Sequence, residues 1–291
     1  MDGNTLIEVI KSGITMINSS LSAIVGAVVT TLFLRRNTRV TEFEKIKAGK
    51  FSELIDELLK NGKMSYLEYY KCTNFLQIAQ KADTMYQEKE STEPKYYDFD
   101  WFIRFFEYSS NVSNDDMQAL WAKILAGEVQ NPNSTSITLL NTLSMMRQEQ
   151  AQFFCNISRF ALMDMDISKN LAHLLIFVST NREAYERENI TPTTLKNLER
   201  LGLLECNFLD EYVFMNKKIF RTGNKIITVY GDPSNQGKIK AGNIKFTEDG
   251  QLLYSALDND LKRYRGDILD FTITRFQKRN CRVTINGREV K

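Results

Sequence analysis

The stretch SNDDMQALWAKILAGEVQNPNSTSITLLNTLSMM, Ser113 to Met146, has the clearest helical punctuation in this chain of 291 residues. Ser113 and Asp116 have the spacing of an N-terminal capping box, and acidic residues favour the positive end of a helix dipole. The helical spacing predicts a buried stripe of Met117, Leu120, Trp121, Ile124 and Leu125. Gly127 and the Asn131-Pro132-Asn133 turn end the helix. The stretch therefore predicts short helices joined by tight turns.

Changes in pattern on either side of this stretch divide the chain into four segments. The polar run STEPKYYD, Ser91 to Asp98, marks one boundary, because Pro94 lies in it among polar residues. The predicted fold class is mainly α, with an α+β part at the C-terminus. The segments are an N-terminal transmembrane segment (1–37), a helical stalk or hairpin (38–90), a helical core (91–165), and a winged-helix-like domain with a terminal β-hairpin (166–291).

The transmembrane prediction rests on 23 uncharged residues between Lys11 and Arg35. As a helix they would be about 34 Å long, enough to cross a hydrocarbon core of about 30 Å. One basic residue precedes the run, whereas Arg35, Arg36, Arg39 and further lysines follow it closely. The positive-inside rule then places the N-terminus outside and the C-terminal body in the cytoplasm. A hydrophobic assembly helix in a soluble oligomer is the alternative.

Small and hydroxyl-bearing residues recur along one side of this predicted span. The stripe consists of Thr15, Ser19, Ser22, Gly26 and Thr30. Residues of this kind let helix backbones approach closely in a membrane and form hydrogen bonds across the interface. The stripe predicts a packing face and hence a homo-oligomer, with a plain anchor or a pore lining as alternatives.

The C-terminal part has the order of elements of a winged helix. Thr191 caps a helix that ends at Gly202, and strands are expected at Tyr212–Met215 and Ile226–Tyr230. In a DNA-binding version this helix would enter the major groove and offer Lys196, Asn197 and Arg200. Because two glutamates lie nearby, this is little charge for neutralising phosphates, and nucleic acid is not expected as a partner.

Two further elements are expected in this part of the chain. An apolar helix is predicted from Leu171 to Val178, with His173, the chain's one histidine, as a structural residue. The tail from Asp267 to Lys291 alternates as FTITRF and CRVTI and has a turn at Asn286-Gly287, which predicts a terminal β-hairpin.

Composition and motif searches argue against most enzyme classes. The chain has 38 basic and 36 acidic residues, so its net charge of +2 is not that of a polycation. The four cysteines are too widely spaced for a zinc knuckle or a CxxC redox motif. The loop GDPSNQGKI, Gly231 to Ile239, has five residues between its glycines where a Walker loop has four. The sequence therefore predicts no enzyme and no catalytic, cofactor or metal site.

The runs MQALWAKILAGEV and NPNSTSITLLNTLSMM resemble bacterial proteins of the domain-of-unknown-function 2806 family, and are more distantly similar to abortive-infection alpha-like proteins. One departure is Pro132-Asn133, where the family usually has Pro-Gly. Within the motif, Trp121 is assigned to the core, and Lys123 and Glu128 to solvated faces or modest salt bridges. The resemblance implies a bacterial or prophage protein in phage defence.

These inferences combine into one functional prediction. The chain would be a single-pass protein of the bacterial inner membrane, whose cytoplasmic body senses a phage or host protein and alters the packing of its membrane helices. Its expected partners are the lipid bilayer and further copies of itself. The alternative is a membrane-tethered winged-helix regulator associated with DNA, which a steep salt dependence of DNA binding would reveal.

Overall fold

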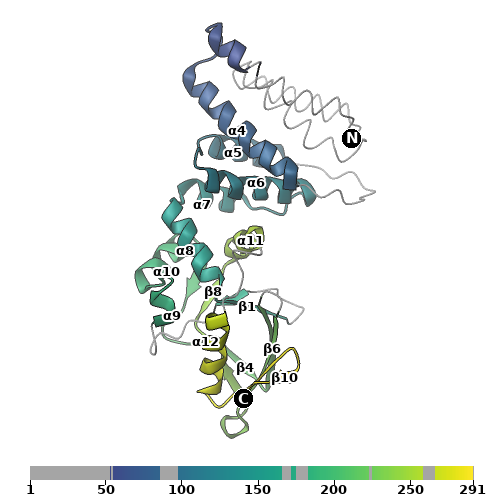
Figure 1. Cartoon of the computed structure of the whole chain (residues 1–291), viewed down its shortest axis with the longest axis vertical. Coiled ribbons are helices and arrows are strands. Elements are labelled where there is room, and N and C mark those ends of the chain that lie inside the picture. The colour runs from purple at the N-terminus through teal and green to yellow at the C-terminus, as the bar shows by residue number, and fades with distance from the viewer. Residues whose placement is uncertain are drawn as a thin grey trace, which may run out of the picture. The chain divides into compact units, whose positions relative to one another are not determined.

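The computed structural model describes residues 53, 55–85, 98–165, 172–174, 183–222, 225–257 and 266–290. The chain divides into two compact units, Met1–Ser144 and Met145–Lys291. Figure 1 shows helices in the described part of the first unit, and both helices and strands in the second.

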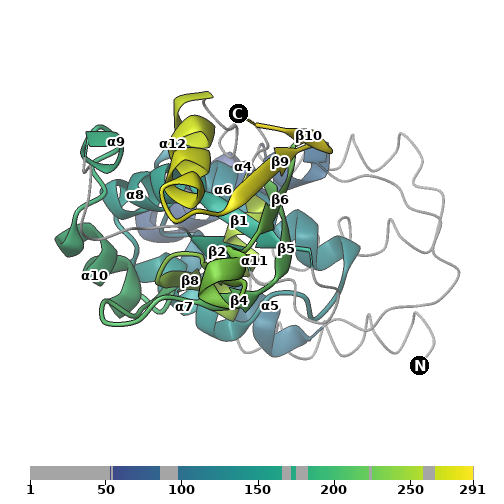
Figure 2. The ribbon, with the colours of Figure 1, turned by 90° about the horizontal axis from the view of Figure 1, so that it is seen from below.

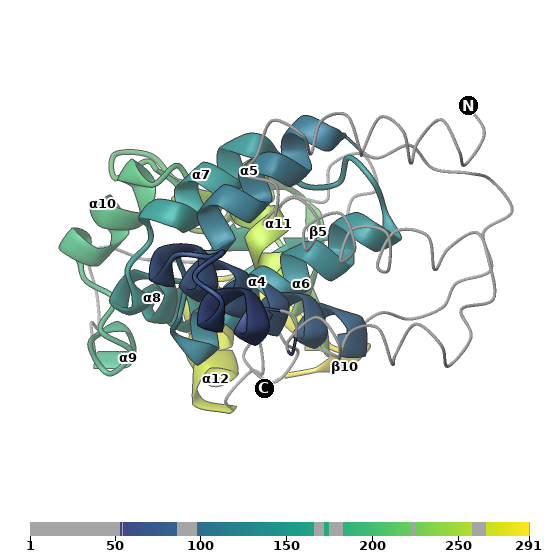
Figure 3. The same cartoon turned by 90° about the horizontal axis from the view of Figure 1, so that it is seen from above.

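The described part of the first unit is helical. A short helical stretch at residues 55–60 is followed by Gly62, whose positive φ of 66° closes the turn. Four longer helices follow: α4 (Tyr66–Met85), α5 (Phe99–Ser109), α6 (Asp115–Gln130) and α7 (Ile137–Met145). Helix α4 packs on α5 and α6 (Figure 3). Asn114 rather than Ser113 caps α6, because its side-chain oxygen accepts the Met117 N–H at 3.1 Å.

Aromatic rings fill the core of this unit. Phe75 on α4 makes edge contacts with three phenylalanines of α5, the nearest being Phe106 at 5.0 Å between ring centroids. Phe105 stacks on Trp101 at 5.2 Å and meets Trp121 of α6 edge-on at 5.3 Å. Trp121 is fully buried, so its assignment to the core is confirmed. Such rings contribute a large share of the buried apolar area.

The carboxylate of Glu128 organises the loop that follows α6. Glu128 is only 2% exposed, so its assignment to a solvated face is wrong. It accepts backbone N–H groups from Asn133 at 2.5 Å, Ser134 at 3.1 Å and Thr135 at 2.9 Å. Asn133 has a positive φ of 63° and bends the chain back towards the carboxylate. In the LWAKILAGE motif, the glutamate therefore satisfies buried donors of the NPNST loop.

The second unit is built on an antiparallel sheet. The order of its strands is β10-β9-β6-β5-β1-β2-β8-β3, and β4 pairs with β7 in a separate ribbon. The strands are β1 (Ala161–Asp164), β2 (Ala172–Leu174), β3 (Leu204–Cys206), β4 (Val213–Met215), β5 (Lys217–Thr222), β6 (Lys225–Tyr230), β7 (Lys238–Lys240), β8 (Ile244–Phe246), β9 (Arg282–Ile285) and β10 (Arg288–Glu289). The helices are α8 (Gln148–Ser158), α9 (Glu183–Glu186), α10 (Pro192–Arg200), α11 (Glu248–Ala256) and α12 (Gly266–Gln277), with a 3-10 turn at Pro233–Asn235.

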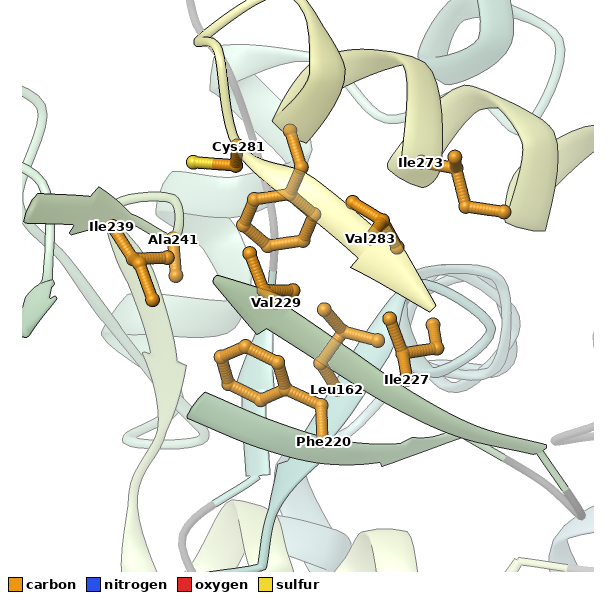
Figure 4. Close-up of a cluster of buried hydrophobic side chains, with 10 residues drawn as sticks. Leu162, Phe220, Ile227, Val229, Ile239, Ala241, Ile273, Cys281 and Val283 are labelled. Carbon is orange, nitrogen blue, oxygen red and sulfur yellow. The ribbon is translucent and has the colours of Figure 1, made fainter. Parts of the chain in front are cut away.

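Helix α12 covers one face of the sheet and packs along β9 (Figure 2). Phe276 of this helix stacks on Phe220 of β5 with 6.2 Å between ring centroids. The hydrophobic cluster between α12 and the sheet, shown in Figure 4, consists of Leu162, Phe220, Ile227, Val229, Ile239, Ala241, Ile273, Phe276, Cys281 and Val283. Burial of these side chains is the main apolar contribution to the stability of this half of the sheet.

Other helices cover the opposite face at the other end of the sheet. Phe246 of β8 packs on Phe154 of α8 and on Tyr254 of α11, at 5.6 and 5.4 Å between ring centroids. The strand register places Phe246, Leu204 and Ile244 on the face opposite Leu162. The helices therefore cover different faces at the two ends of the sheet.

The prediction of a membrane protein is corrected by the helices themselves. Among the described residues, none of the helices combines the length and the apolar composition that crossing a bilayer requires. The predicted span, its stripe from Thr15 to Thr30 and the flanking Arg35, Arg36 and Arg39 lie outside the described residues. Eight of its 23 residues are Ser, Thr or Asn, so the run predicts a span less strongly than an unbroken apolar stretch of the same length would.

The mainly α fold class with a winged helix is also wrong. Helix α10 does begin with a Thr191 cap, but β3 and β8 after it belong to a sheet of eight strands. The two strands expected to form the wing do not pair with each other, because β4 pairs with β7 whereas β6 pairs with β5 and β9. The architecture depends on pairing between strands that are far apart in the sequence, and hydrophobic periodicity carries no information about such pairing.

Two local assignments change their secondary structure. Residues 172–174, predicted within a helix, form strand β2. The run FTITRF, predicted as a strand, lies in α12, where Ile268, Thr272 and Phe276 are buried at helical intervals. Short apolar runs are ambiguous between helix and strand, and here tertiary packing decided. The hairpin turn at Asn286-Gly287 between β9 and β10 is confirmed.

The loop Gly231–Gly237 is held closed by backbone contacts, from which a prediction follows. Asn216 N–H donates to the carbonyl of Gly237 at 2.7 Å, and its own carbonyl accepts the Gly231 N–H at 2.9 Å. A β-carbon on Gly231 would overlap the Gly237 carbonyl. Gly231→Ala should therefore lower the free energy of unfolding by about 2 kcal/mol.

Chemical denaturation followed by circular dichroism measures this change. The control is Gly127→Ala in α6, where a β-carbon meets no atom within 4 Å. That variant should be stabilised by about 0.5–1 kcal/mol, because alanine loses less conformational freedom than glycine. Equal stabilities for Gly231→Ala and the unmodified chain would contradict the closed loop.

Candidate binding face on the β-sheet

Strands β5, β6 and β9 bury one face and expose the other. On β5, Phe220 lies in the core while Lys217 and Arg221, which point to the opposite face, are exposed. The same alternation continues on β6 and β9. The exposed and half-buried residues on this side, with one residue of β1, are named the open face. They are Met163, Lys217, Ile219, Arg221, Ile226, Thr228, Tyr230, Arg282 and Thr284.

The register arranges the open face in rows that run across the strands. The rows are Lys217–Tyr230–Arg282, Ile219–Thr228–Thr284, and Met163–Arg221–Ile226. Neighbouring residues in a row lie about 4.8 Å apart, and successive rows about 6.6 Å apart. The three cations of the open face are therefore spread over a platform about 10 Å by 13 Å.

The first row is held together by cation–π contacts. The guanidinium carbon of Arg282 lies 4.3 Å from the centroid of the Tyr230 ring, and the ammonium of Lys217 lies 5.7 Å from it. An aromatic ring attracts a cation without neutralising its charge. The row therefore fixes two positive charges on either side of one ring and leaves both available to an anion.

The third row leads into a cleft. One guanidinium nitrogen of Arg221 donates to the sulfur of Met163 at 3.0 Å. Beside them, α11 borders the open face, and a cleft of about 520 Å³ opens between helix and strands. It is lined by Met163, Arg221, Glu248, Gln251, Leu252 and Tyr254. Burial raises the pKa of the Tyr254 phenol, and the positive charge of Arg221 opposes part of that rise.

Positive charge on the open face is not balanced within it. None of the ion pairs found among the described residues involves Lys217, Arg221 or Arg282. The acidic residue that the register places next to these rows is Glu289, opposite Thr284 at the edge of the sheet. An anionic ligand would therefore meet exposed cations without having to break an internal salt bridge.

The residues that a DNA-binding winged helix would have offered, Lys196, Asn197 and Arg200, lie elsewhere. On α10, the ammonium of Lys196 pairs with the Glu199 carboxylate at 2.6 Å and lies 5.1 Å from the Phe208 ring. Hydrogen bonding to Lys196 is the main reason that the pKa of Glu199 is lowered. Asn197 is half-buried and Arg200 is exposed. The structure does not bring these residues to the open face, and Lys196 already has an acidic partner.

Sequence reasoning missed the cations of the open face. A partial signal was present in KKIFRT and KIITVY, where burial alternates along each strand, but polar character follows it incompletely because Lys218 is buried and Ile226 is exposed. Only the pairing of β5 with β6 and β9 shows that Lys217, Tyr230 and Arg282 share a row. Among the described residues, no group of three or more His, Cys, Asp or Glu side chains is placed to hold a metal ion.

Comparison with known proteins gives one finding. The family described as "Protein of unknown function (DUF2806)" matches residues 61–265, which contain the LWAKILAGE motif and strands β1 to β8. Neither the curated proteins nor the solved structures give a match. The predicted role in phage defence and the distant similarity to abortive-infection proteins are thus unsupported, because the matching family carries no assigned function.

Proposed function

The chain belongs to the DUF2806 family of proteins of unknown function, and on that premise we propose that its second unit is a binding module that holds single-stranded nucleic acid on the open face. The observation that carries the proposal is the row Lys217–Tyr230–Arg282. In it two exposed cations lie against the ring of Tyr230, which does not neutralise their charge. Binding rather than catalysis is the role proposed for this surface.

The shape of the open face favours a single strand. An exposed antiparallel sheet is a platform on which an unpaired strand lies with its bases spread out, as in other sheet-based RNA-binding modules. Proteins that hold single strands without reading sequence combine a positive surface with stacking groups. Here Lys217, Arg221 and Arg282 supply charge. The guanidinium of Arg282, whose central carbon lies 4.3 Å from the centroid of the Tyr230 ring, also supplies a planar surface for a base.

The hydroxyl groups of the middle row fit the same role. Thr228 and Thr284 lie side by side between the two rows that hold the cations. Both are partly exposed, so each can donate to a phosphate or sugar oxygen. Ile226 is 43% exposed at the end of the third row and offers an apolar contact to a base. Charge, hydroxyl and apolar groups thus occur together on one surface.

Fluorescence anisotropy with labelled oligouridine, titrated into the full-length protein over a series of salt concentrations, tests the proposal. Each phosphate contact adds about 0.7 to the slope of log affinity against log salt for a single strand. The triple variant Lys217→Ala/Arg221→Ala/Arg282→Ala should therefore lose a slope of about 2 and most of its affinity at low salt. Lys278→Ala, which removes an exposed cation of the segment after α12, should leave both unchanged.

Several outcomes would overturn the proposal. One is no binding of oligouridine by the unmodified chain at low salt, and another is equal binding by the triple variant and the unmodified chain. Polyglutamate competing as well as oligouridine, with the same loss in the triple variant, would assign the open face to an acidic polypeptide instead. Circular dichroism of each variant shows whether the sheet is intact, so that misfolding is not mistaken for lost contacts.

A further inference from the structure

The cleft beside α11 adjoins the open face through one shared side chain. Arg221 belongs to the third row of the open face and also lines the cleft. A strand lying on the open face could therefore place one base in the cleft while its phosphates remain on the platform. We propose that this cleft is a base-recognition subsite that prefers guanine; the inference rests on the proposed function.

The walls of the cleft offer donors on one side and acceptors on the other. Arg221 carries N–H groups in a planar fork, and one of its terminal nitrogens already donates to Met163. Glu248, at the first position of α11, is exposed and contributes carboxylate oxygens, which only accept. Arginine pairs with the O6 and N7 acceptors of guanine, the most frequent specific contact to a base. The carboxylate then suits the N1–H and N2 amino donors on the neighbouring edge of the same ring.

Other bases satisfy this pair of side chains less well. Adenine presents an N6 amino donor beside N7, so an arginine fork would face one donor and one acceptor. Cytosine and uracil lack the N7 position and bury less area against Leu252 and Met163. Gln251 carries both a donor and an acceptor and does not discriminate by itself. Arg221 and Glu248 together therefore determine the preference.

The remaining surface of the cleft suits a planar ring. Leu252 of α11 and Met163 of β1 contribute apolar surface, and the Tyr254 ring is 8% exposed beneath them. A base would cover this apolar area while its polar edge faces Arg221 and Glu248. Sites for small ligands commonly combine apolar walls with a few placed polar groups.

Competition experiments with the full-length protein test the inference. Unlabelled oligouridines that carry one central G, A or C compete against labelled oligouridine, and free GMP, AMP, CMP and UMP are compared in parallel. The G-containing strand should bind about tenfold more tightly than the others, as expected for one good bidentate pair. GMP should likewise be the most effective of the mononucleotides.

Two neutralising substitutions separate base reading from charge. Glu248→Gln should lower the ratio of G to U affinity several-fold, because an amide cannot accept both donors of guanine while the contacts of Arg221 to O6 and N7 remain. Glu289→Gln removes a carboxylate at the edge of the sheet and should keep the ratio at about ten. Equal binding of the four strands, or an unchanged ratio in Glu248→Gln, would overturn this inference and leave the proposed function standing. Failure of every oligonucleotide to bind would overturn the proposed function instead.

Discussion

Replacing Glu128 by alanine should lower the free energy of unfolding of the first unit by about 3 kcal/mol or more. The carboxylate accepts the backbone N–H groups of Asn133, Ser134 and Thr135 at 2.5, 3.1 and 2.9 Å. Alanine would leave these donors in a partly buried loop without an acceptor, and hydrogen bonds to a charged group are worth about 1.5–3 kcal/mol each. Some of the loss would be recovered by water entering the loop.

Tryptophan fluorescence during denaturation is suited to this measurement. Both tryptophans of the chain, Trp101 and Trp121, are buried in the first unit, so their emission reports on that unit alone. Glu128→Gln is the matched control, since it keeps one acceptor oxygen without the charge and should lose about half as much stability. A transition in Glu128→Ala identical to that of the unmodified chain would show that the loop does not depend on the carboxylate.

Removing Asp164 should lower the stability of the second unit by about 3–5 kcal/mol, as expected for breaking a buried ion pair. The Asp164 carboxylate on β1 lies 2.8 Å from the ammonium of Lys218 on β5, and the two side chains are 10% and 8% exposed. The ammonium also lies 4.6 Å from the centre of the Phe214 ring. Asp164→Ala would leave this buried ammonium without its carboxylate, and burying such a charge is expensive.

The double variant Asp164→Leu/Lys218→Met separates the effect of the ion pair on stability from the effect of side-chain packing. Replacing both members of a buried pair by apolar residues of similar volume is often neutral or stabilising. The double variant should therefore be clearly more stable than Asp164→Ala. Far-UV circular dichroism follows the sheet, and the tryptophan transition of the first unit should not shift. A double variant as unstable as the single one would show that shape rather than charge dominates at this position.

The helices of the first unit could be predicted from sequence because their signals are local. The predicted stripe of α6 and the turn after Gln130 depend on residues within a few positions of one another. The turn agrees with the structure, and the stripe is buried except at Leu120, which is half-buried. Even there, the role of Glu128 escaped prediction, since it depends on the loop folding back over the end of the helix. Local spacing indicated the helix but not the contacts beyond it.

The sheet and the open face could not be predicted in this way. Arg221 pairs with Met163 across 58 positions of sequence, and Tyr230 pairs with Arg282 across a similar distance. In KKIFRT the buried side of the strand carries Lys218 as well as Phe220, so the sequence indicates neither the buried side clearly nor the strands that lie beside it. The FTITRF run illustrates the opposite error, because its alternation suggested a strand while α12 was required to cover the core. In both cases the deciding information lies in pairings distant along the chain.

The short strands at the two edges of the eight-stranded sheet should limit aggregation through strand pairing between molecules. At one margin β10 consists of Arg288 and Glu289, and at the other β3 has three residues, one of which, Cys206, gives its backbone N–H to Glu199. Edge strands that are short, charged or already hydrogen-bonded within the molecule offer few free backbone groups to a second molecule. A chain cut after Ile285 would instead present the margin of β9, with Val283 and Ile285, to its neighbours, and intermolecular strand pairing would follow.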